Sequence, residues 1–355
     1  MQISKESLSG YILEEVLAYL IRTTGYELLV DPKQDPRELD RRGNGLVIKG
    51  RGAVHQVDVL GELKWIPAFT FPLRLIVEAK FRKNKTGIDV VRNAVSVVLD
   101  VNQNNSPTLE QKIFFPKYQY VYAIFSTSGF TKPAIDLAIA HQISLIDLSG
   151  NEYAQLRNAI KRAASDILRK IDSGIEINRE QLVSKLRNIL RKELGTFPPH
   201  LDVPNNMSLE PLDSYRRYLD PVISIAKEYK ELFVGMTNGP FMLLLKSNNP
   251  DRFLNFAKQR PSHRVIINWS YLENMGEIWR ISPADAPNKY ELSFKLPERL
   301  YKWIFDTEKE RKRRALRVKK EYFSNITIYR YERENDYLFR LRFDPEATQK
   351  YISRR

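Results

Sequence analysis

The chain has 355 residues and is strongly basic, with 57 Lys and Arg against 43 Asp and Glu and a formal net charge of +14. It contains no cysteine, which excludes disulfide scaffolds and Cys-based zinc sites and is compatible with the reducing cytoplasm. No apolar run of about 18 residues and no signal sequence is present, so we expect a cytoplasmic chain that does not enter a membrane. The excess of cations favours a polyanionic partner, because long-range attraction accelerates such encounters.

The N-terminal segment predicts an amphipathic helix over residues 10–25. Apolar residues recur at helical spacing from Ile12 to Ile21, and Gly25 closes the helix. Two adjacent carboxylates, Glu14 and Glu15, interrupt its early part. Taken alone, they are explained by the helix macrodipole, which favours acidic side chains near a helix start.

The next informative segments are VHQVDVLG and RLIVEAK, which both predict strands. Residues two apart in a strand share a face, so Glu78 and Lys80 point the same way and Ala79 points to the other side. Asp58 stands in an otherwise apolar run, where an unpaired carboxylate is costly to bury. An acid-x-Lys triplet by itself is most often a solvated strand end.

These side chains match the needs of a magnesium site. Mg²⁺ takes oxygen ligands, usually one or two carboxylates together with waters and substrate phosphates. Asp58 and Glu78 could supply the carboxylates, and the backbone carbonyl of Ala79 is a further candidate ligand. Lys80 could orient or deprotonate an attacking water and offset charge in the transition state.

Downstream, the pattern predicts a helix over 89–101, a strand over 118–127, a loop and helix over 128–142 and a strand over 143–150. The complete order is helix, three strands, helix, strand, helix, strand, which is typical of an α/β fold with a mixed sheet. Three hydroxyl residues stand where the strand over 118–127 ends. Ser126, Thr127 and Ser128 could contact a phosphate, or they could be helix-capping residues before Thr131, and the sequence favours neither interpretation.

The first 150 residues resemble the Mrr-type restriction endonucleases of the PD-(D/E)xK nuclease superfamily. The likeness is carried by the order of the first helix, VHQVDVLG, RLIVEAK and the block FSTSGFTKPAIDLAIAHQISLIDLSG. This chain has Glu-Ala-Lys where many relatives have Gln-x-Lys, and Glu is a competent ligand. The resemblance implies a restriction-endonuclease-like mixed sheet flanked by helices, and a Mg²⁺-dependent endonuclease in which Mn²⁺ can substitute.

Residue by residue, the resemblance assigns catalysis to Glu14 in the first helix, Asp58 in the second strand, and Glu78 and Lys80 in the third. Glu15 remains the alternative to Glu14. The implied reaction hydrolyses double-stranded DNA to a 5′-phosphate and a 3′-hydroxyl, in restriction or host defence. A homodimer or higher oligomer is expected, because two cuts in a duplex need two sites. The alternatives are a structure-specific repair or recombination nuclease, such as a junction resolvase, and a DNA-binding protein without catalysis.

Further DNA-contact candidates lie in a basic turn and beside it. RRGNGLVIKGRG contains four glycines but lacks the GKS or GKT ending of a phosphate-binding loop, so it predicts a turn that leads into the Asp58 strand. Arg51 at its end could line a DNA-binding cleft. His55 is either structural or a phosphate contact, because the four histidines show no metal-ligand spacing.

The chain divides into a nuclease domain over 1–150, a helical bridge with a Pro-rich linker over 151–208, and an α+β domain over 209–355 that could recognise the target. The last part resembles no family that we recognise. Asn238-Gly239 is a hairpin signal, and one long helix is predicted over 298–323. That helix holds the densest basic run, including Arg313 and Arg317, which is either a solvated face or a DNA contact assisted by nearby aromatic residues.

Overall fold

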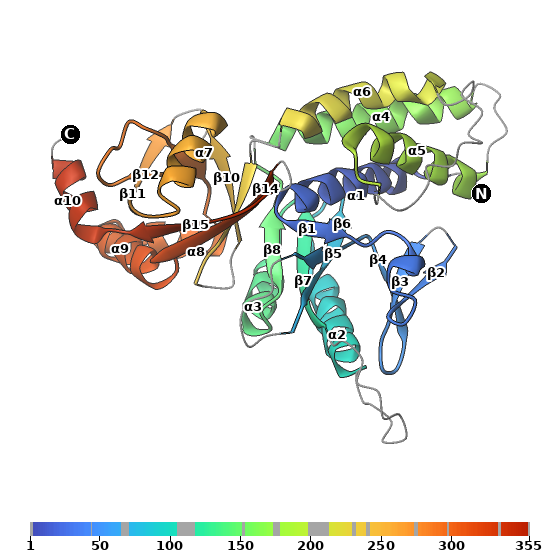
Figure 1. The fold of residues 1–355 in the computed structure, drawn as a ribbon, viewed down its shortest axis with the longest axis horizontal. Helices are drawn as coiled ribbons and strands as arrows, with labels where there is room; N and C mark the ends of the chain where they lie inside the picture. Colours follow the sequence, from blue (N-terminus) through green and yellow to red (C-terminus); the bar gives the residue numbers. More distant parts are fainter. Residues whose placement is uncertain are drawn as a thin grey trace. The chain divides into compact units, whose positions relative to one another are not determined.

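The structure of the protein is a computed structural model, and it divides into two compact units, Met1–Tyr229 and Lys230–Arg355. The mixed α/β class expected from the element order is confirmed (Figure 1). No helix among the described residues is long and apolar enough to cross a membrane. The described residues are 3–43, 45–64, 71–104, 118–150, 153–172, 178–197, 213–228, 232–238, 242–272, 276–296, 298–332 and 335–353.

The first unit is built on a five-stranded mixed sheet with the order β1-β5-β6-β7-β8. The pairs β1–β5 and β5–β6 are antiparallel, whereas β6–β7 and β7–β8 are parallel. The register places Glu78 beside Ile124 and Lys80 beside Ser126. The strands are β1 (Tyr26–Leu28), β5 (Val59–Leu63), β6 (Leu73–Lys80), β7 (Gln119–Ser126) and β8 (Ser144–Asp147).

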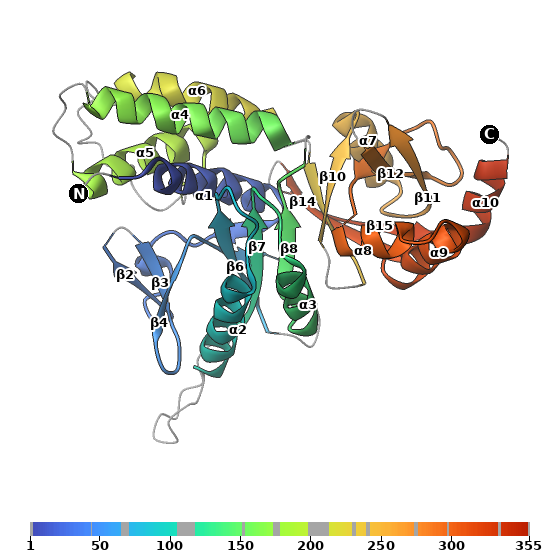
Figure 2. The same cartoon turned by 180° about the vertical axis from the view of Figure 1, so that it is seen from behind.

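Helices cover this sheet on both sides (Figures 1 and 2). α2 (Ile88–Gln103) and α3 (Lys132–Ala140) bury apolar side chains in one core with Ile76 and Ile124 of the sheet. α1 (Lys5–Thr23) contacts β5 and β6 and begins at Ser4, whose side chain accepts a hydrogen bond from the Ser7 amide. The carboxylates of α1 therefore lie near the strands that carry Asp58 and Glu78.

Three further helices belong to the first unit. α4 (Ala154–Asp172) and α5 (Arg179–Leu194) pack on α1, and α6 (Asp213–Glu228) packs on α4 and α5. Leu219 and Val222 of α6 are fully buried. Burial of these apolar stripes makes the helical bridge part of the first unit, which extends to Tyr229 and includes a helix that the sequence division at 208 placed in the C-terminal part.

The predicted strand over 54–61 forms two strands that belong to different sheets. β4 (Val54–Val57) joins β2 (Leu39–Arg42) and β3 (Gly45–Lys49) in an antiparallel three-stranded sheet, whereas β5 belongs to the main sheet. The chain bends at Asp58, between the two strands. The single-strand prediction is wrong here, and the bend presents the Asp58 side chain at the edge of β6.

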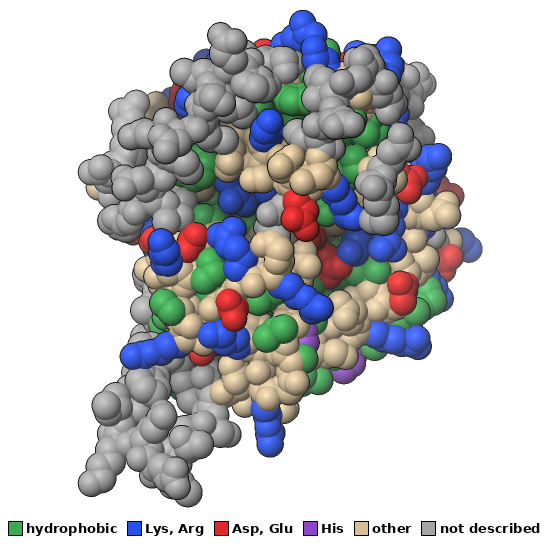
Figure 3. All heavy atoms as spheres, turned by 90° about the vertical axis from the view of Figure 1, so that its right-hand side faces the viewer, with side chains coloured by type: hydrophobic (Ala, Val, Ile, Leu, Met, Phe, Trp, Pro, Cys, Tyr) green, Lys and Arg blue, Asp and Glu red, His purple; other side chains and the backbone are tan. Residues whose placement is uncertain are grey.

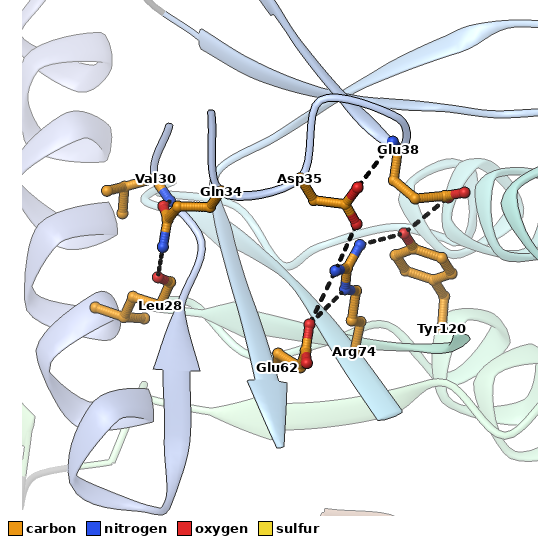
Figure 4. Close-up of polar contacts among 8 residues, drawn as sticks. All are labelled: Leu28, Val30, Gln34, Asp35, Glu38, Glu62, Arg74 and Tyr120. Atoms are coloured by element: carbon orange, nitrogen blue, oxygen red, sulfur yellow. Dashed lines mark hydrogen bonds and ion pairs between the residues drawn. The ribbon is translucent and has the colours of Figure 1, made fainter. Parts of the chain in front are cut away.

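A buried arginine attaches the segment before β2 to the sheet (Figure 4). Arg74 on β6 is 1% exposed and donates hydrogen bonds to Glu62 at 2.9 and 3.0 Å and to the Tyr120 hydroxyl at 3.1 Å. It also forms an ion pair with Asp35 at 2.7 Å, while the Tyr120 hydroxyl donates to Glu38. The network joins β5, β6 and β7 to residues 35–38.

The second unit contains a closed seven-stranded barrel with the order β10-β13-β12-β11-β15-β14-β9. Its core includes Trp279, Phe294 and Phe323, which pack as aromatic pairs. β9 and β10 pair antiparallel, as the hairpin signal predicts, although Gly239 itself lies outside the described residues. The elements are β9 (Leu232–Met236), β10 (Met242–Ser247), α7 (Pro250–Gln259), β11 (Ser262–Leu272), β12 (Gly276–Pro283), β13 (Leu292–Phe294), α8 (Glu298–Phe305), α9 (Arg311–Glu321), β14 (Asn325–Glu332), β15 (Asn335–Phe343) and α10 (Pro345–Ser353).

The long helix predicted over 298–323 is wrong, because the chain turns between α8 and α9. Thr307 is extended, with φ −131° and ψ 119°, and a short 3-10 turn follows over Glu308–Glu310. Arg314 then donates a hydrogen bond to the carbonyl of Trp303 at 2.6 Å, which brings the two helices together. The basic run therefore lies mainly on α9.

We expect Arg74→Met to destabilise the protein by about 3 kcal/mol, because loss of the buried guanidinium leaves the partly buried carboxylates of Asp35 and Glu62 uncompensated. The matched control is Arg41→Met, whose side chain is half exposed and pairs with Asp31, and which should change the free energy of unfolding by less than about 1 kcal/mol. Urea unfolding followed by circular dichroism measures both. Equal effects of the two substitutions would contradict a structural role for the Arg74 network.

Candidate active site

Glu78 and Lys80 lie at the carboxyl end of β6 and form an ion pair with each other. Their contact follows from the two-residue alternation of a strand, as the sequence predicts. The other carboxylate oxygen of Glu78 accepts a hydrogen bond from the hydroxyl of Tyr122 on β7. Burial and the neighbouring Glu78 carboxylate raise the pKa of Tyr122, so its hydroxyl stays protonated and donates to Glu78.

Asp58 reaches the same place from the bend between β4 and β5. Val59 pairs with Val77, and the Asp58 carboxylate accepts a hydrogen bond from the Ala79 amide at 2.8 Å. Burial, with a smaller contribution from Glu78, raises the pKa of Asp58 to about 6, although the Ala79 hydrogen bond and the Lys80 charge act in the opposite direction. The Asp58 carboxylate thus takes its hydrogen bond from a neutral backbone N–H, while the charges of Lys80 and Arg187 partly offset the effect of burial on its pKa.

α1 adds two buried carboxylates, which face α5. Glu14 forms an ion pair with Arg187, and Glu15 forms ion pairs with Arg187 and Arg191 at 3.4 and 2.9 Å. Burial and then the Asp58 charge raise the pKa of Glu14 to about 8, against the opposing effect of Arg187. Since Glu14 interacts electrostatically with Asp58 while Glu15 is held by two arginines, the arrangement favours Glu14 as the helix carboxylate of this site.

The donor atoms suit a hard divalent cation. Among the described residues, no group of three or more His, Cys, Asp or Glu side chains is arranged to hold a metal. Asp58 and Glu78 nevertheless supply two carboxylates, and the Ala79 carbonyl is directed to the same strand edge as the Ala79 amide that donates to Asp58. Two carboxylates and one backbone carbonyl are hard oxygen donors of the kind that Mg²⁺ and Mn²⁺ take, so these residues fit such a cation.

Sequence reasoning missed Tyr122, Arg187 and Arg191. Tyr122 had a local signal, because it is one of several aromatic residues that alternate along the predicted strand over 118–127. Arg187 and Arg191 lie four residues apart on one face of α5, but nothing in the sequence connects them to a helix more than 170 residues earlier. Only the packing of α5 on α1 shows their function.

The three hydroxyl residues at the end of β7 make hydrogen bonds within the protein. Ser126 is fully buried and bonds to the hydroxyl of Thr86 at 2.8 Å and to the Gly129 carbonyl at 3.0 Å. Thr127 bonds to the Lys80 carbonyl, and Ser128 donates to the Asn84 carbonyl at 2.6 Å. These contacts favour a structural role over direct phosphate binding, and Thr131 itself caps α3.

The remaining DNA-contact candidates lie outside this cluster. His55 bonds to Asp100 of α2 at 2.7 Å, and Asp100 also accepts from the amides of Gly52 and Ala53, so His55 helps to hold the exposed turn that carries Arg51. Arg313 and Arg317 belong to the second unit, where they pair with Glu310 and Glu321 on the same helical segment. These ion pairs favour the solvated-face interpretation of the basic run.

The surface charge is unevenly placed. On the face drawn in Figure 3, Lys and Arg side chains lie around a hollow that contains acidic side chains. Such a distribution can hold a polyanion at its rim and a cation in its centre.

Comparisons with known proteins give no family. No family model matches the chain, and no curated protein matches it. Among solved structures, the chain is similar to the crystal structure of a protein of unknown function, AF1548, with a TM-score of 0.31 and 14% identity over 60% of this chain and 98% of that chain. A likeness of this size supports no statement about fold or function.

We expect Glu14→Gln to change how stability depends on pH. The folded-state pKa of Glu14 is raised from 4.5 to about 8, so its contribution to stability is complete below pH 4.5 and is lost as the pH rises toward 8. The unfolding free energy of the wild type should therefore decline between pH 5 and 8, and the substitution should flatten this decline by on the order of 2 kcal/mol.

Urea unfolding in EDTA at pH 5, 6, 7 and 8 measures the effect. Glu6→Gln is the matched control, since Glu6 is an exposed residue of the same helix. An unchanged slope in Glu14→Gln would show that burial of this carboxylate does not govern the pH dependence.

Proposed function

We propose that the first unit is a metal-dependent DNA endonuclease of the Mrr type, with the restriction-endonuclease-like fold of the PD-(D/E)xK superfamily. One observation carries the proposal. Asp58, Glu78 and Lys80 meet at the end of β6, and Glu14 of α1 interacts electrostatically with Asp58. These are the four residues to which the resemblance in the sequence assigns catalysis.

Asp58, Glu78 and the Ala79 carbonyl would hold Mg²⁺ or Mn²⁺. When bound, the metal supplies Lewis-acid polarisation of the phosphate and a bound water of lowered pKa. Lys80 orients the attacking water or accepts its proton, and its position is fixed by Glu78. Tyr122 holds Glu78 in turn, and Glu14 assists from α1 through a second metal or an outer-shell water.

The substrate that we propose is double-stranded DNA, cut to a 5′-phosphate and a 3′-hydroxyl in restriction or host defence. The charge of +14 supports a polyanionic substrate. Two cuts in a duplex call for two sites, so we propose that the protein acts in the cytoplasm as a homodimer or higher oligomer. The second unit would then select the target.

We expect the 355-residue chain to cut plasmid DNA with Mg²⁺ or Mn²⁺ and to be inactive in EDTA. Asp58→Asn and Lys80→Ala should each lower the cleavage rate by about 10²–10⁴-fold, because each removes a group that acts on the reacting atoms. Lys161→Ala is the matched control, since Lys161 is an exposed lysine of α4. A gel assay on plasmid and on branched DNA measures the rates.

The pattern of cutting separates the alternatives. Plasmid cleavage that survives both substitutions would refute the assigned site. Cleavage of branched DNA alone would favour a repair or recombination nuclease. DNA binding without cleavage under any divalent cation would favour a binding protein.

We also expect Mg²⁺ or Mn²⁺ to raise the melting temperature in the absence of DNA, because a ligand that binds the folded state stabilises it. Asp58→Asn and Glu78→Gln should lose this shift, whereas Glu62→Gln, a carboxylate of the Arg74 network, should keep it. Scanning calorimetry in millimolar metal and in EDTA measures the shift in melting temperature. Equal shifts in all variants would place the metal elsewhere.

A further inference from the structure

The loop between β6 and α2 begins directly after Lys80 and is unusually basic. Its residues from Phe81 to Gly87 read FRKNKTG, and the side chains of Arg82, Lys83, Asn84 and Lys85 are exposed. An extended chain spans at most about 3.6 Å per residue, so the backbone of Arg82 lies within about 7 Å of that of Lys80. The first cations of the loop thus stand beside the candidate active site.

The backbone of this loop is fixed by the segment that follows β7. The Thr127 amide donates to the Lys80 carbonyl at 3.0 Å, and the Arg82 amide donates to the Thr127 hydroxyl at 3.3 Å. Ser128 donates to the Asn84 carbonyl at 2.6 Å. The loop is therefore bonded to 126–131 near its start and at its centre.

The end of the loop is anchored in the same way. The Thr86 amide donates to the Gly129 carbonyl at 2.9 Å, and the Thr131 amide donates to the Thr86 carbonyl at 3.0 Å. Thr86 is fully buried, and its hydroxyl bonds to that of Ser126. Gly129 has a φ of +72°, in the left-handed region where a side chain is strained, so glycine suits this turn.

The first two cations of the loop, Arg82 and Lys83, are both exposed. Within the described part of the chain, neither Arg82 nor Lys83 takes part in an ion pair of the structure. In contrast, Arg313, Arg314 and Arg317 of α9 all pair with glutamates. Two adjacent exposed cations on a fixed backbone are thus available to an anion, while most arginines of α9 are already paired.

We propose that the 82–85 loop binds the phosphate backbone of DNA next to the bond that is cut, with Arg82 and Lys83 as its principal contacts. This inference rests on the proposed nuclease function and names the element that positions the substrate. Phosphate contacts fix the register and orientation of a nucleic acid on a protein. The hydroxyls of Ser126, Thr127 and Ser128 contribute indirectly, because they hold the loop that makes the contacts.

The test compares the double variant Arg82→Ala/Lys83→Ala with Lys161→Ala/Arg162→Ala, two adjacent exposed cations of α4. Both are made in the 355-residue chain, with and without Asp58→Asn. Binding to a fluorescent duplex of about 30 base pairs is measured by anisotropy at several salt concentrations. The loop variant should bind about 10-fold or more weakly at low salt, and the slope of log K against log salt should fall by about 1–2. The α4 variant should change both quantities much less.

At subsaturating DNA, cleavage by the loop variant should fall by about the same factor as its affinity, whereas the α4 variant should cleave at the wild-type rate, because Lys161 and Arg162 lie outside the proposed site. Arg82→Lys/Lys83→Arg should restore binding, which separates lost charge from a disturbed fold. If the wild type cuts DNA and the loop substitutions change neither the affinity for DNA nor the slope of log K against log salt, this inference alone is overturned. Protein that binds through the loop but never cuts would overturn the proposed function alone, and no binding would overturn both.

Discussion

The first unit has to compensate the charge of several acidic side chains that lie close together, buried or partly buried, between α1 and the end of β6. Glu14 and Glu15 are buried and Asp58 and Glu78 are partly buried, whereas the charged groups that face them are Lys80, Arg187 and Arg191. Removing a carboxylate from water is costly unless it is paired. The packing of α5 on α1 meets part of this requirement, because it brings Arg187 between two glutamates. The helices after residue 150 are therefore needed to make the acidic site stable, as well as to bury their own apolar stripes.

β6 carries charged side chains at both ends. Arg74 stands at the start, enclosed by acidic partners and a tyrosine, while Glu78 and Lys80 stand at the end. Between them Leu75, Ile76 and Val77 are buried and fix the register of the central strand. Because β6 is held on both sides by β5 and β7, the separation of the two polar sites is set by the sheet, and the candidate active site rests on a rigid element.

The sequence predicts correctly those features of the structure that depend on residues close together in the chain. The alternation in RLIVEAK predicts that Glu78 and Lys80 share a face, and they form an ion pair. The sequence did not indicate the bend at Asp58 or the turn at Thr307. The bend is held by a hydrogen bond from the Ala79 amide to Asp58. The turn is closed by a hydrogen bond from Arg314 to the Trp303 carbonyl. Closure of the seven-stranded barrel and the pairing of Arg187 with Glu14 are likewise non-local. Tertiary contacts of this kind leave no periodic signal in a single sequence.

The two acidic networks of the first unit differ in a way that bears on function. Around Arg74 the guanidinium donates to Glu62 and Tyr120 and pairs with Asp35, so both carboxylates contact a positive charge directly. Asp58 instead accepts a neutral backbone N–H, and burial raises its pKa. A carboxylate that serves only the fold is expected to have its charge compensated within the fold. Under the proposed function, the carboxylates at the end of β6 and the exposed Arg82 and Lys83 form one site that a cation and a polyanion would complete.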